Sequence, residues 1–409
     1  MPHETELVVT VAAGLGLAFV FGFAAARLRL PPLVGYLLAG VVLSPFTPGP
    51  VGDTALAGQL AEIGVILLMF GVGLHFSFED LLAVRRVAVP GAAAQIAVAT
   101  GLGLAAARLW GWSWGAGLVF GVTLSVASTV VLLRALEQRG ILASRDGRIA
   151  TGWLIVEDIA TVLVLVLLPV LAGSLGGTSP GAGSQPLPIA IALTLGKVAV
   201  FVAVMHMFGR RAVPWLLQRV ARVGSRELFT LGVLAIALGI AVGAAFLFGV
   251  SFALGAFFAG VVISESELSQ RAASDALPLQ DAFSVLFFVS VWMLFDPSVL
   301  VREPLRLLLV LGIIVVGKSA AAFAIVRAFG LPASTALTIS ASLAQIGEFS
   351  FILAALGVSL GLLPAEARSL VVAGALISIT LHPFVFNAAA AWARRGAGLL
   401  AETKDPTAT

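Results

Sequence analysis

Two adjacent acidic residues, Glu157 and Asp158, lie inside the apolar segment GWLIVEDIATVLVLVLLP at residues 152–169. Ionisable residues inside a bilayer are costly, and they usually belong to an ion or proton pathway. A carboxylate beside hydroxyl and carbonyl oxygens can bind a monovalent cation, and the same carboxylate can bind a proton. If the two compete for one site that opens to one side at a time, obligatory exchange of cation for proton follows.

The composition places these acids in a membrane protein. The chain has 409 residues, of which 60% are hydrophobic and 11% are charged, and its mean hydropathy is +1.09. A soluble globular protein carries about 25% charged residues. The apolar runs are too long for the strands of a β-barrel, so the fold class is an all-α integral membrane protein.

The two acids differ in position on their helix. Asp158 lies nine residues after Ile149, where the helix enters the membrane, and nine residues of helix rise about 13 Å into a core about 30 Å thick. Glu157 points about 100° away from Asp158 around the helix. We therefore predict that Asp158 binds the ion and that Glu157 assists or tunes it. The alternative is a structural ion pair, which fits Glu157 better because a lysine or a helix end can serve as its partner.

Two further charged residues lie at similar depth in later segments. Lys318, in GIIVVGKSAAAF, is the expected counter-charge for the acid pair. A buried lysine can neutralise an empty site and release its proton when a cation arrives, although a fixed salt bridge that only holds the fold remains the alternative. Glu348 is expected either to pair with a basic residue such as Lys318 or to stabilise the N-terminus of a half-helix.

The sequence contains an internal repeat. LLAGVVLS at residues 37–44 matches FFAGVVIS at 257–264, and TLSVAST at 123–129 aligns with SLAQIGE at 342–348 at nearly the same offset. These matches predict two homologous halves, about 6–172 and 227–393, joined by a separate span at 188–208. Because the equivalent second and ninth spans start on opposite sides of the membrane, the halves are expected to be inverted, which is typical of secondary transporters.

Small polar residues occur at equivalent positions of the two halves. They are Ser125, Ser128 and Thr129 in the span at 115–136, and Gln345 and Glu348 in the span at 334–358. We predict that both helices unwind at mid-membrane and cross there, so that carbonyls and half-helix ends surround one point. The alternative is that the small residues only allow close helix packing.

Thirteen spans can be read from the apolar runs, each of which needs roughly 20 residues. Their ranges are 6–26, 31–47, 56–74, 87–108, 115–136, 149–172, 188–208, 227–245, 249–264, 280–297, 304–328, 334–358 and 364–392. Of the 24 basic residues, Lys197 and Lys318 lie within spans, Arg108, Arg302, Arg306 and Arg368 lie in loops on one side, and the others, including Arg29 and Lys404, lie on the opposite side. The positive-inside rule then predicts an external N-terminus and a cytoplasmic C-terminus.

Several kinds of function are excluded by what the sequence lacks. Cysteine is absent, and the four histidines are scattered, so no histidine–cysteine metal set is expected. There is no glycine-rich nucleotide motif and no soluble domain to carry one. The basic loops indicate membrane orientation rather than nucleic-acid binding. We therefore expect a transporter, not an enzyme, with no cofactor, whose partners are a monovalent cation, the proton and the lipid bilayer.

The segments GWLIVEDIATVLVLVLLP, FFVSVWM (287–293) and AQIGEFSFILA (344–354) resemble the monovalent cation:proton antiporter-2 family. The most similar branch is the Kef-type potassium efflux group, including YbaL-like proteins, over about residues 6–393. The resemblance implies the thirteen-helix sodium/proton antiporter fold, with a six-helix ion-transport core and a dimerisation domain. It implies that Asp158 is the essential carrier of cation and proton and that Lys318 matches the family's basic residue.

Two departures from the family pattern affect the expected function. The position of Glu157 is commonly Asn or Gln in the family, so the extra carboxylate leaves stoichiometry and electrogenicity open. Kef-type proteins usually continue into a cytosolic nucleotide-binding domain, whereas this sequence stops at Thr409. Either that domain is missing from the sequence or the protein lacks it, so neither glutathione nor nucleotide control is predicted.

The sequence thus predicts a homodimeric transporter of the bacterial inner membrane that exchanges K⁺, or alternatively Na⁺, for H⁺ by elevator-type alternating access. The helices at 87–172 and 304–393 would form the moving core, and those at 6–74 and 188–297 the scaffold. The cation would bind at Asp158, with the polar residues of the two breaks lining the crossing. The alternatives are a gated potassium channel or efflux pore on the same scaffold, and a non-transporting membrane sensor subunit.

Overall fold

The computed structural model describes residues 6–28, 30–47, 54–74, 78–178, 186–293 and 295–402. The described residues form helices and connecting loops without strands, as the fold class predicted. Helices occur at each of the thirteen predicted spans, and ten of the described helices are long and apolar enough to cross a membrane. Arg29, Lys404 and the chain end at Thr409, which entered the predictions, lie outside the described residues.

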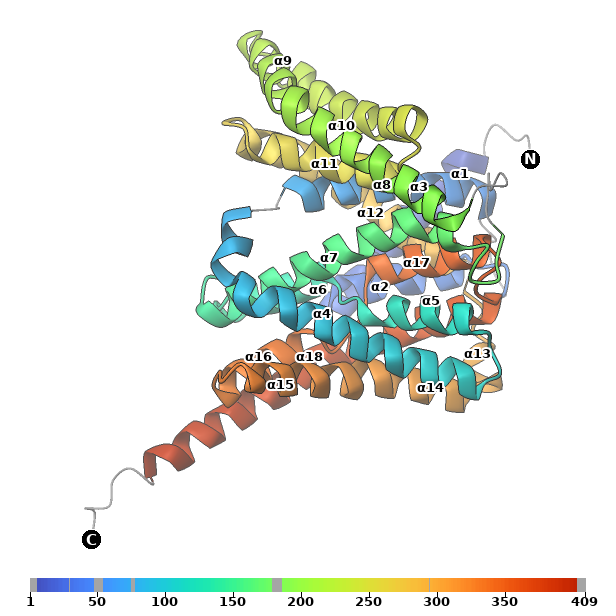
Figure 1. The fold of residues 1–409 in the computed structure, drawn as a ribbon, viewed down its shortest axis with the longest axis vertical. Coiled ribbons are helices and arrows are strands. Elements are labelled where there is room, and N and C mark those ends of the chain that lie inside the picture. The colour runs from blue at the N-terminus through green and yellow to red at the C-terminus, as the bar shows by residue number, and fades with distance from the viewer. Residues whose placement is uncertain are drawn as a thin grey trace. The chain divides into compact units, whose positions relative to one another are not determined.

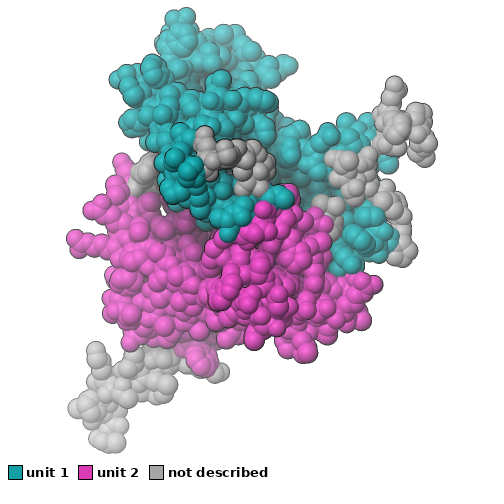
Figure 2. Space-filling model, turned by 45° about the vertical axis from the view of Figure 1, so that its right-hand side comes forward, with its two compact units in different colours: residues 1–78, 162–174, 178–297 teal, residues 79–161, 175–177, 298–409 magenta. Residues whose placement is uncertain are grey.

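The chain divides into two compact units, which are coloured separately in Figure 2. Unit 1 contains residues 1–78, 162–174 and 178–297, and unit 2 contains residues 79–161, 175–177 and 298–409. Helix α7 (Arg145–Leu171) begins in unit 2 and ends in unit 1. Glu157 and Asp158 both lie on the part of α7 that belongs to unit 2.

Unit 1 consists of helices that pack closely through small residues. Its elements are α1 (Glu6–Arg27), α2 (Pro32–Val42), α3 (Thr54–Leu74), α8 (Leu187–Val204), the π-helical turn η2 (Met205–Gly209), α9 (Arg210–Arg222), α10 (Arg226–Phe248), α11 (Phe252–Ser264) and α12 (Ser269–Met293). A Cβ at Gly73 would lie 2.1 Å from the Phe257 carbonyl oxygen, and one at Gly260 would lie 2.2 Å from that of Phe70. Only glycine therefore lets α3 and α11 approach so closely.

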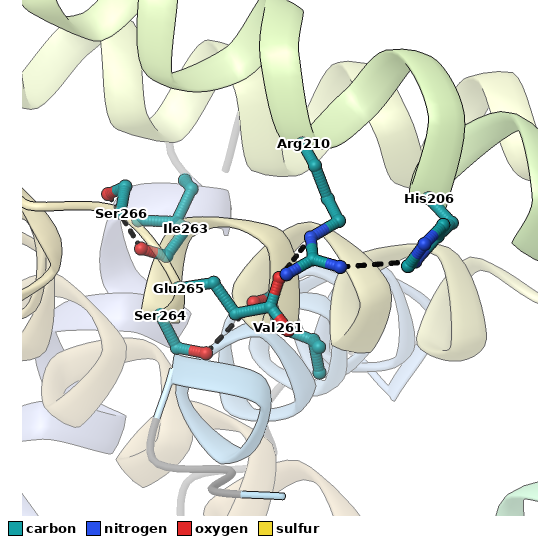
Figure 3. A network of polar contacts seen from close by, with 7 residues as sticks. All are labelled: His206, Arg210, Val261, Ile263, Ser264, Glu265 and Ser266. Carbon is teal, nitrogen blue, oxygen red and sulfur yellow. Dashed lines mark hydrogen bonds and ion pairs between the residues drawn. The ribbon is translucent and has the colours of Figure 1, made fainter.

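An ion pair joins the start of α9 to the residue that follows α11 in unit 1 (Figure 3). Arg210, the first residue of α9, forms an ion pair with Glu265, which follows the end of α11. His206 lies one turn before Arg210, and its Nδ1 is 3.4 Å from the arginine Nη1. The interruption of the helix by η2 separates the apolar α8 from the arginine-rich α9.

Unit 2 contains both acids and both predicted breaks. Its elements are α4 (Phe78–Leu109), α5 (Trp114–Ser125), α6 (Thr129–Glu137), the first part of α7, α13 (Val299–Arg302), α14 (Pro304–Leu311), the π-helical segment η3 (Gly312–Gly317), α15 (Lys318–Ala328), α16 (Ala333–Ser342), α17 (Glu348–Ser359) and α18 (Ala365–Glu402). A buried apolar cluster that includes Trp153, Leu343 and Phe386 packs α7, the second break and α18 together. The helices on either side of the two breaks, α5 and α6 and then α16 and α17, are labelled in Figure 1.

Large apolar side chains are exposed on the outer helices of both units. Phe246 and Leu247 are 80% and 79% exposed in unit 1, and Leu305 is 79% exposed in unit 2. Such surfaces are unusual for a soluble monomer but suit contact with lipid. The chain is therefore a multi-pass membrane protein.

Candidate functional site: two interrupted helices that cross beside buried carboxylates

The first break separates α5 from α6. Helix α5 ends at Ser125, and Val126 and Ser128 have extended backbones, so the helical hydrogen bonding stops for three residues. Ser128 then caps α6, because its Oγ accepts a hydrogen bond from the Val131 N–H at 3.3 Å. The small residues thus interrupt the helix, as the sequence predicted, instead of serving only as packing surface.

The second break separates α16 from α17. Helix α16 ends at Ser342, and Gly347 precedes α17 with φ −139° and ψ −156°. Glu348 is the first residue of α17. Under the repeat found in the sequence, Ser128 corresponds to Gly347 and Thr129 corresponds to Glu348, so the two helices are interrupted at equivalent positions.

The two breaks cross in contact with each other and in antiparallel directions. Ser350 Oγ lies 3.4 Å from the Val126 carbonyl oxygen, and Ser128 Oγ donates to Glu348 at 3.0 Å. The Gln345 side chain binds the Ser128 backbone twice: its Oε1 accepts from the Ser128 N–H at 2.8 Å, and its Nε2 donates to the Ser128 carbonyl at 3.2 Å. The amide of Gln345 therefore satisfies both polar groups of a residue that has left its helix.

Replacing Gly347 by alanine is expected to lower the free energy of unfolding by about 1–3 kcal/mol, the usual cost of overpacking. A Cβ at Gly347 would lie 2.4 Å from the Ser128 Cβ and 2.5 Å from its Cα. Thermal denaturation of the purified protein measures the effect. The matched control is Gly101→Ala on α4, where a Cβ meets no atom within 4 Å. Equal unfolding midpoints for the two variants would contradict the close crossing.

Asp158 lies beside the N-terminus of α6. Its carboxylate is 4% exposed, and its Oδ2 accepts a hydrogen bond from Thr129 Oγ1 at 3.0 Å. Its Oδ1 is buried and has no hydrogen-bond partner in the protein. The positive end of the half-helix favours an anion at this point. The arrangement is therefore a carboxylate held by one oxygen, with the other buried and without a partner in the protein.

Glu157 contacts a different part of the first break. Its Oε2 accepts a hydrogen bond from the Ala127 N–H at 2.9 Å, and its side chain is fully buried. Its charge interacts with that of Lys318. The two adjacent acids thus have separate surroundings, as expected from their divergence around the helix.

Lys318 is fully buried and begins α15 directly after η3. A π-helical segment changes the direction of the side chains that follow it, and such segments often occur at functional sites. The Lys318 Nζ donates to the Gln345 carbonyl at 3.1 Å, within the second break. The lysine therefore contacts the second break, and its charge acts on Glu157, although the two form none of the ion pairs found among the described residues.

Glu348, in the second break, binds Ser128, the residue next to the hydrogen-bond donor of Asp158. Its Oε2 accepts from Ser128 Oγ, its charge acts on Asp158, and it is 1% exposed. None of the ion pairs found among the described residues includes Glu348. Of the two roles considered for it, the position at the N-terminus of α17 is observed, and a salt bridge with Lys318 is not.

Two residues at the breaks were not identified from the sequence. Gln95 on α4 is fully buried and donates through Nε2 to the Ser125 carbonyl at 3.1 Å, at the end of α5. His382 on α18 is 2% exposed and faces the carbonyls of Ala341 and Ser342, at the end of α16. A single polar residue inside an apolar helix is the signal that could have indicated both.

The polar groups of the breaks are oxygen ligands, which suit an alkali cation. Within the described residues, no group of three or more histidine, cysteine, aspartate and glutamate side chains is arranged to hold a metal ion. The Ser125 hydroxyl donates to the Val122 carbonyl within α5, and the Ser125 carbonyl accepts the hydrogen bond from Gln95. Ser128, Thr129 and Gln345 contribute the hydrogen bonds of the crossing itself.

Interrupted helices that cross beside a buried carboxylate are typical of secondary transporters. The family model for the transmembrane sodium/hydrogen exchanger matches residues 15–392, and the chain belongs to this family. It is therefore a transporter that exchanges a cation for protons, and not an enzyme. The resemblance that the sequence motifs indicated is confirmed.

Among its relatives, the protein named "Putative cation/proton antiporter YbaL" of Escherichia coli K12 is 61% identical over 386 residues, covering 94% of this chain and 69% of that protein. K(+) efflux antiporter 4 of Arabidopsis thaliana is 33% identical, covering 93% of this chain and 62% of that protein. The glutathione-regulated potassium-efflux system protein KefC of Salmonella heidelberg is 34% identical, covering 88% and 57%.

The fold is similar to that of a solved antiporter. The sodium proton antiporter MjNhaP1 from Methanocaldococcus jannaschii has a TM-score of 0.64 with this chain, at 16% sequence identity, and the match covers 94% of this chain and 98% of that one. This likeness confirms the sodium/proton antiporter fold that the sequence predicted.

Proposed function

We propose that the chain exchanges K⁺ for H⁺, with Na⁺ as the alternative cation, and that Asp158 carries both ions in turn. The observation that carries the proposal is the buried Asp158 carboxylate, held by Thr129 through one oxygen while the other lacks a protein partner. The choice of K⁺ is supported by the names of the potassium-efflux relatives. Because one carboxylate binds either the cation or the proton, but not both together, the two movements are coupled without a second binding site.

We further propose that transport occurs by elevator-type movement of unit 2, which contains the carboxylates and both breaks. The helices of unit 1 would then form the fixed scaffold and the homodimer contact. The loop charges support a bacterial inner-membrane protein with an external N-terminus and a cytoplasmic C-terminus.

Proteoliposomes test the exchange directly. An imposed K⁺ gradient is expected to drive protons in the opposite direction, measured with a pH-sensitive dye trapped inside, and K⁺, Na⁺ and Li⁺ gradients compared in turn identify the preferred cation. A channel would conduct K⁺ without a stoichiometric pH change, and a sensor subunit would move neither ion. Either of those results would reject the proposal.

Competition at one carboxylate also predicts the effect of pH. As pH falls, protons occupy Asp158 more often, so the KM for the cation is expected to rise while the maximal rate at saturating cation changes little. Initial rates at several cation concentrations and pH values, equal on the two sides of the membrane, measure this. A KM that is independent of pH while the maximal rate falls would indicate that proton and cation bind at separate sites.

A further inference from the structure

Two neighbouring hydroxyls at the start of α6 bind two different carboxylates. Ser128 Oγ donates to Glu348 Oε2, and Thr129 Oγ1 donates to Asp158 Oδ2, each at 3.0 Å. The two acids come from different helices, α17 and α7, but their donors are adjacent in the chain. Both carboxylates therefore lie at the same end of α6, inside unit 2.

Each of these carboxylates has one oxygen that the protein leaves without a partner. Asp158 Oδ1 and Glu348 Oε1 are both buried and accept no hydrogen bond, in side chains that are 4% and 1% exposed. A buried acceptor without a partner is costly, and a functional ligand is one explanation for such an atom. Two such oxygens from interacting carboxylates indicate a ligand that is positively charged or donates a proton.

The local structure is suited to hold negative charge at this point. Asp158 lies at the N-terminus of α6, and Glu348 begins α17, so each carboxylate lies at the positive end of a different half-helix. Glu348 also occupies the repeat position that corresponds to Thr129, the residue that binds Asp158 in the first half.

We propose that Glu348 is a second carboxylate ligand of the cation site at Asp158, and that the two acids share the proton that the cation displaces. This inference rests on the proposed exchange function and extends it to the composition of the site.

The chemistry of this pair provides the coupling. Two buried carboxylates that repel each other cannot both remain ionised in an empty site, so at least one proton stays on the pair. When a monovalent cation binds between the free oxygens, the carboxylic O–H bond breaks and the proton leaves to water on the side that is open. The reverse step reloads the proton when the cation dissociates. No other reactant is needed.

Three other titratable groups lie near the breaks and have different partners. Glu157 Oε1 is also buried without a hydrogen-bond partner, but the other oxygen of Glu157 binds the Ala127 N–H, not a hydroxyl at the start of α6, and its charge is offset by that of Lys318. Lys318 donates to the Gln345 carbonyl, and His382 faces the carbonyl end of α16. They remain unchanged in the variants below, so a difference between those variants reports on Glu348.

The experiment compares Glu348→Gln with wild-type protein in proteoliposomes. The slope of log KM for K⁺ against pH gives the number of protons that each cation displaces, by linkage. For Glu348→Gln, we expect KM to rise about tenfold or more at high pH, as for the loss of a charged contact. We also expect a shallower slope at high pH, because Asp158 without the repulsion of Glu348 no longer holds a proton there for the cation to displace. Glu348→Asp retains a carboxylate and is expected to keep the wild-type slope.

Glu366→Gln is the matched control, because Glu366 lies in the first turn of α18 and pairs with Arg306, outside both breaks. This variant should leave KM and slope unchanged. Thermal denaturation confirms that each variant is folded. A folded Glu348→Gln protein with the wild-type slope would overturn the inference, whatever its KM. If wild-type protein moved no protons in exchange for cations, the proposed function itself would have failed.

Discussion

Replacing Asp158 by asparagine is expected to abolish cation-driven proton movement while the protein remains folded. Asparagine has the same shape and keeps an oxygen that can accept the hydrogen bond from Thr129. It cannot take up or release a proton, and in place of one carboxylate oxygen it presents an amide N–H₂, which repels a cation. The rate in proteoliposomes should therefore fall to that of protein-free liposomes. Stability should not fall, because the variant removes a buried acid whose Oδ1 has no protein partner.

The matched control for this experiment is Asp146→Asn on the same helix. Asp146 lies in the first turn of α7 and accepts a hydrogen bond from Thr335 at 2.9 Å, near the start of α16 and outside both breaks. This variant is expected to exchange ions at a rate close to that of wild type. Folded Asp158→Asn protein that still moved protons in response to a K⁺ gradient would show that another group carries the ions.

The interrupted helices could be predicted from the sequence because the interruption has a local cause. Short runs of small and polar residues, such as TLSVAST, favour loss of helix where neighbouring helices can satisfy the backbone. The repeat then placed both interruptions at equivalent positions. The positions of the helices were likewise readable from apolar length, since a helix in lipid must satisfy its own backbone.

The partners of the charged residues could not be predicted in the same way. Depth along a helix suggested that Lys318 serves the acid pair, but depth does not determine direction around the helix. In the structure η3 precedes Lys318, and the lysine interacts with Glu157 and the Gln345 carbonyl. No local sequence pattern indicates a π-helical segment, so the direction of this side chain depends on tertiary packing.

The crossing itself depends on contacts over long sequence separation. Gln345 was predicted to line it, but its double hydrogen bond to the Ser128 backbone joins residues 217 positions apart. The role of Gln95 was not predicted, because its partner is the backbone carbonyl of Ser125. Every residue has such a carbonyl, so the sequence does not indicate which one a buried amide will bind. Such contacts become visible only when the two halves of unit 2 are placed together.

Replacing Lys318 by methionine is expected to destabilise the protein by roughly 1–3 kcal/mol, because the buried Glu157 is left without the positive charge that acts on it. Lys318 is fully buried and its charge interacts with that of Glu157, which is also fully buried. The free energy of unfolding in mixed detergent micelles measures the loss. Lys197→Met on α8 is the matched control: this lysine lies in a membrane helix of unit 1 but is exposed, so a change of no more than about 0.5 kcal/mol is expected.

The double variant Glu157→Gln/Lys318→Met is expected to recover most of that stability. Glutamine can still accept the hydrogen bond from the Ala127 N–H, and removing both buried charges together is often neutral or stabilising. The coupling energy from the four proteins should therefore be several times larger than the few tenths of a kcal/mol found for independent sites. Additive effects of the two substitutions would show that Glu157 and Lys318 do not act as a pair. Because the double variant retains Asp158, its exchange activity then decides whether the Glu157–Lys318 pair is needed for transport or only stabilises the crossing.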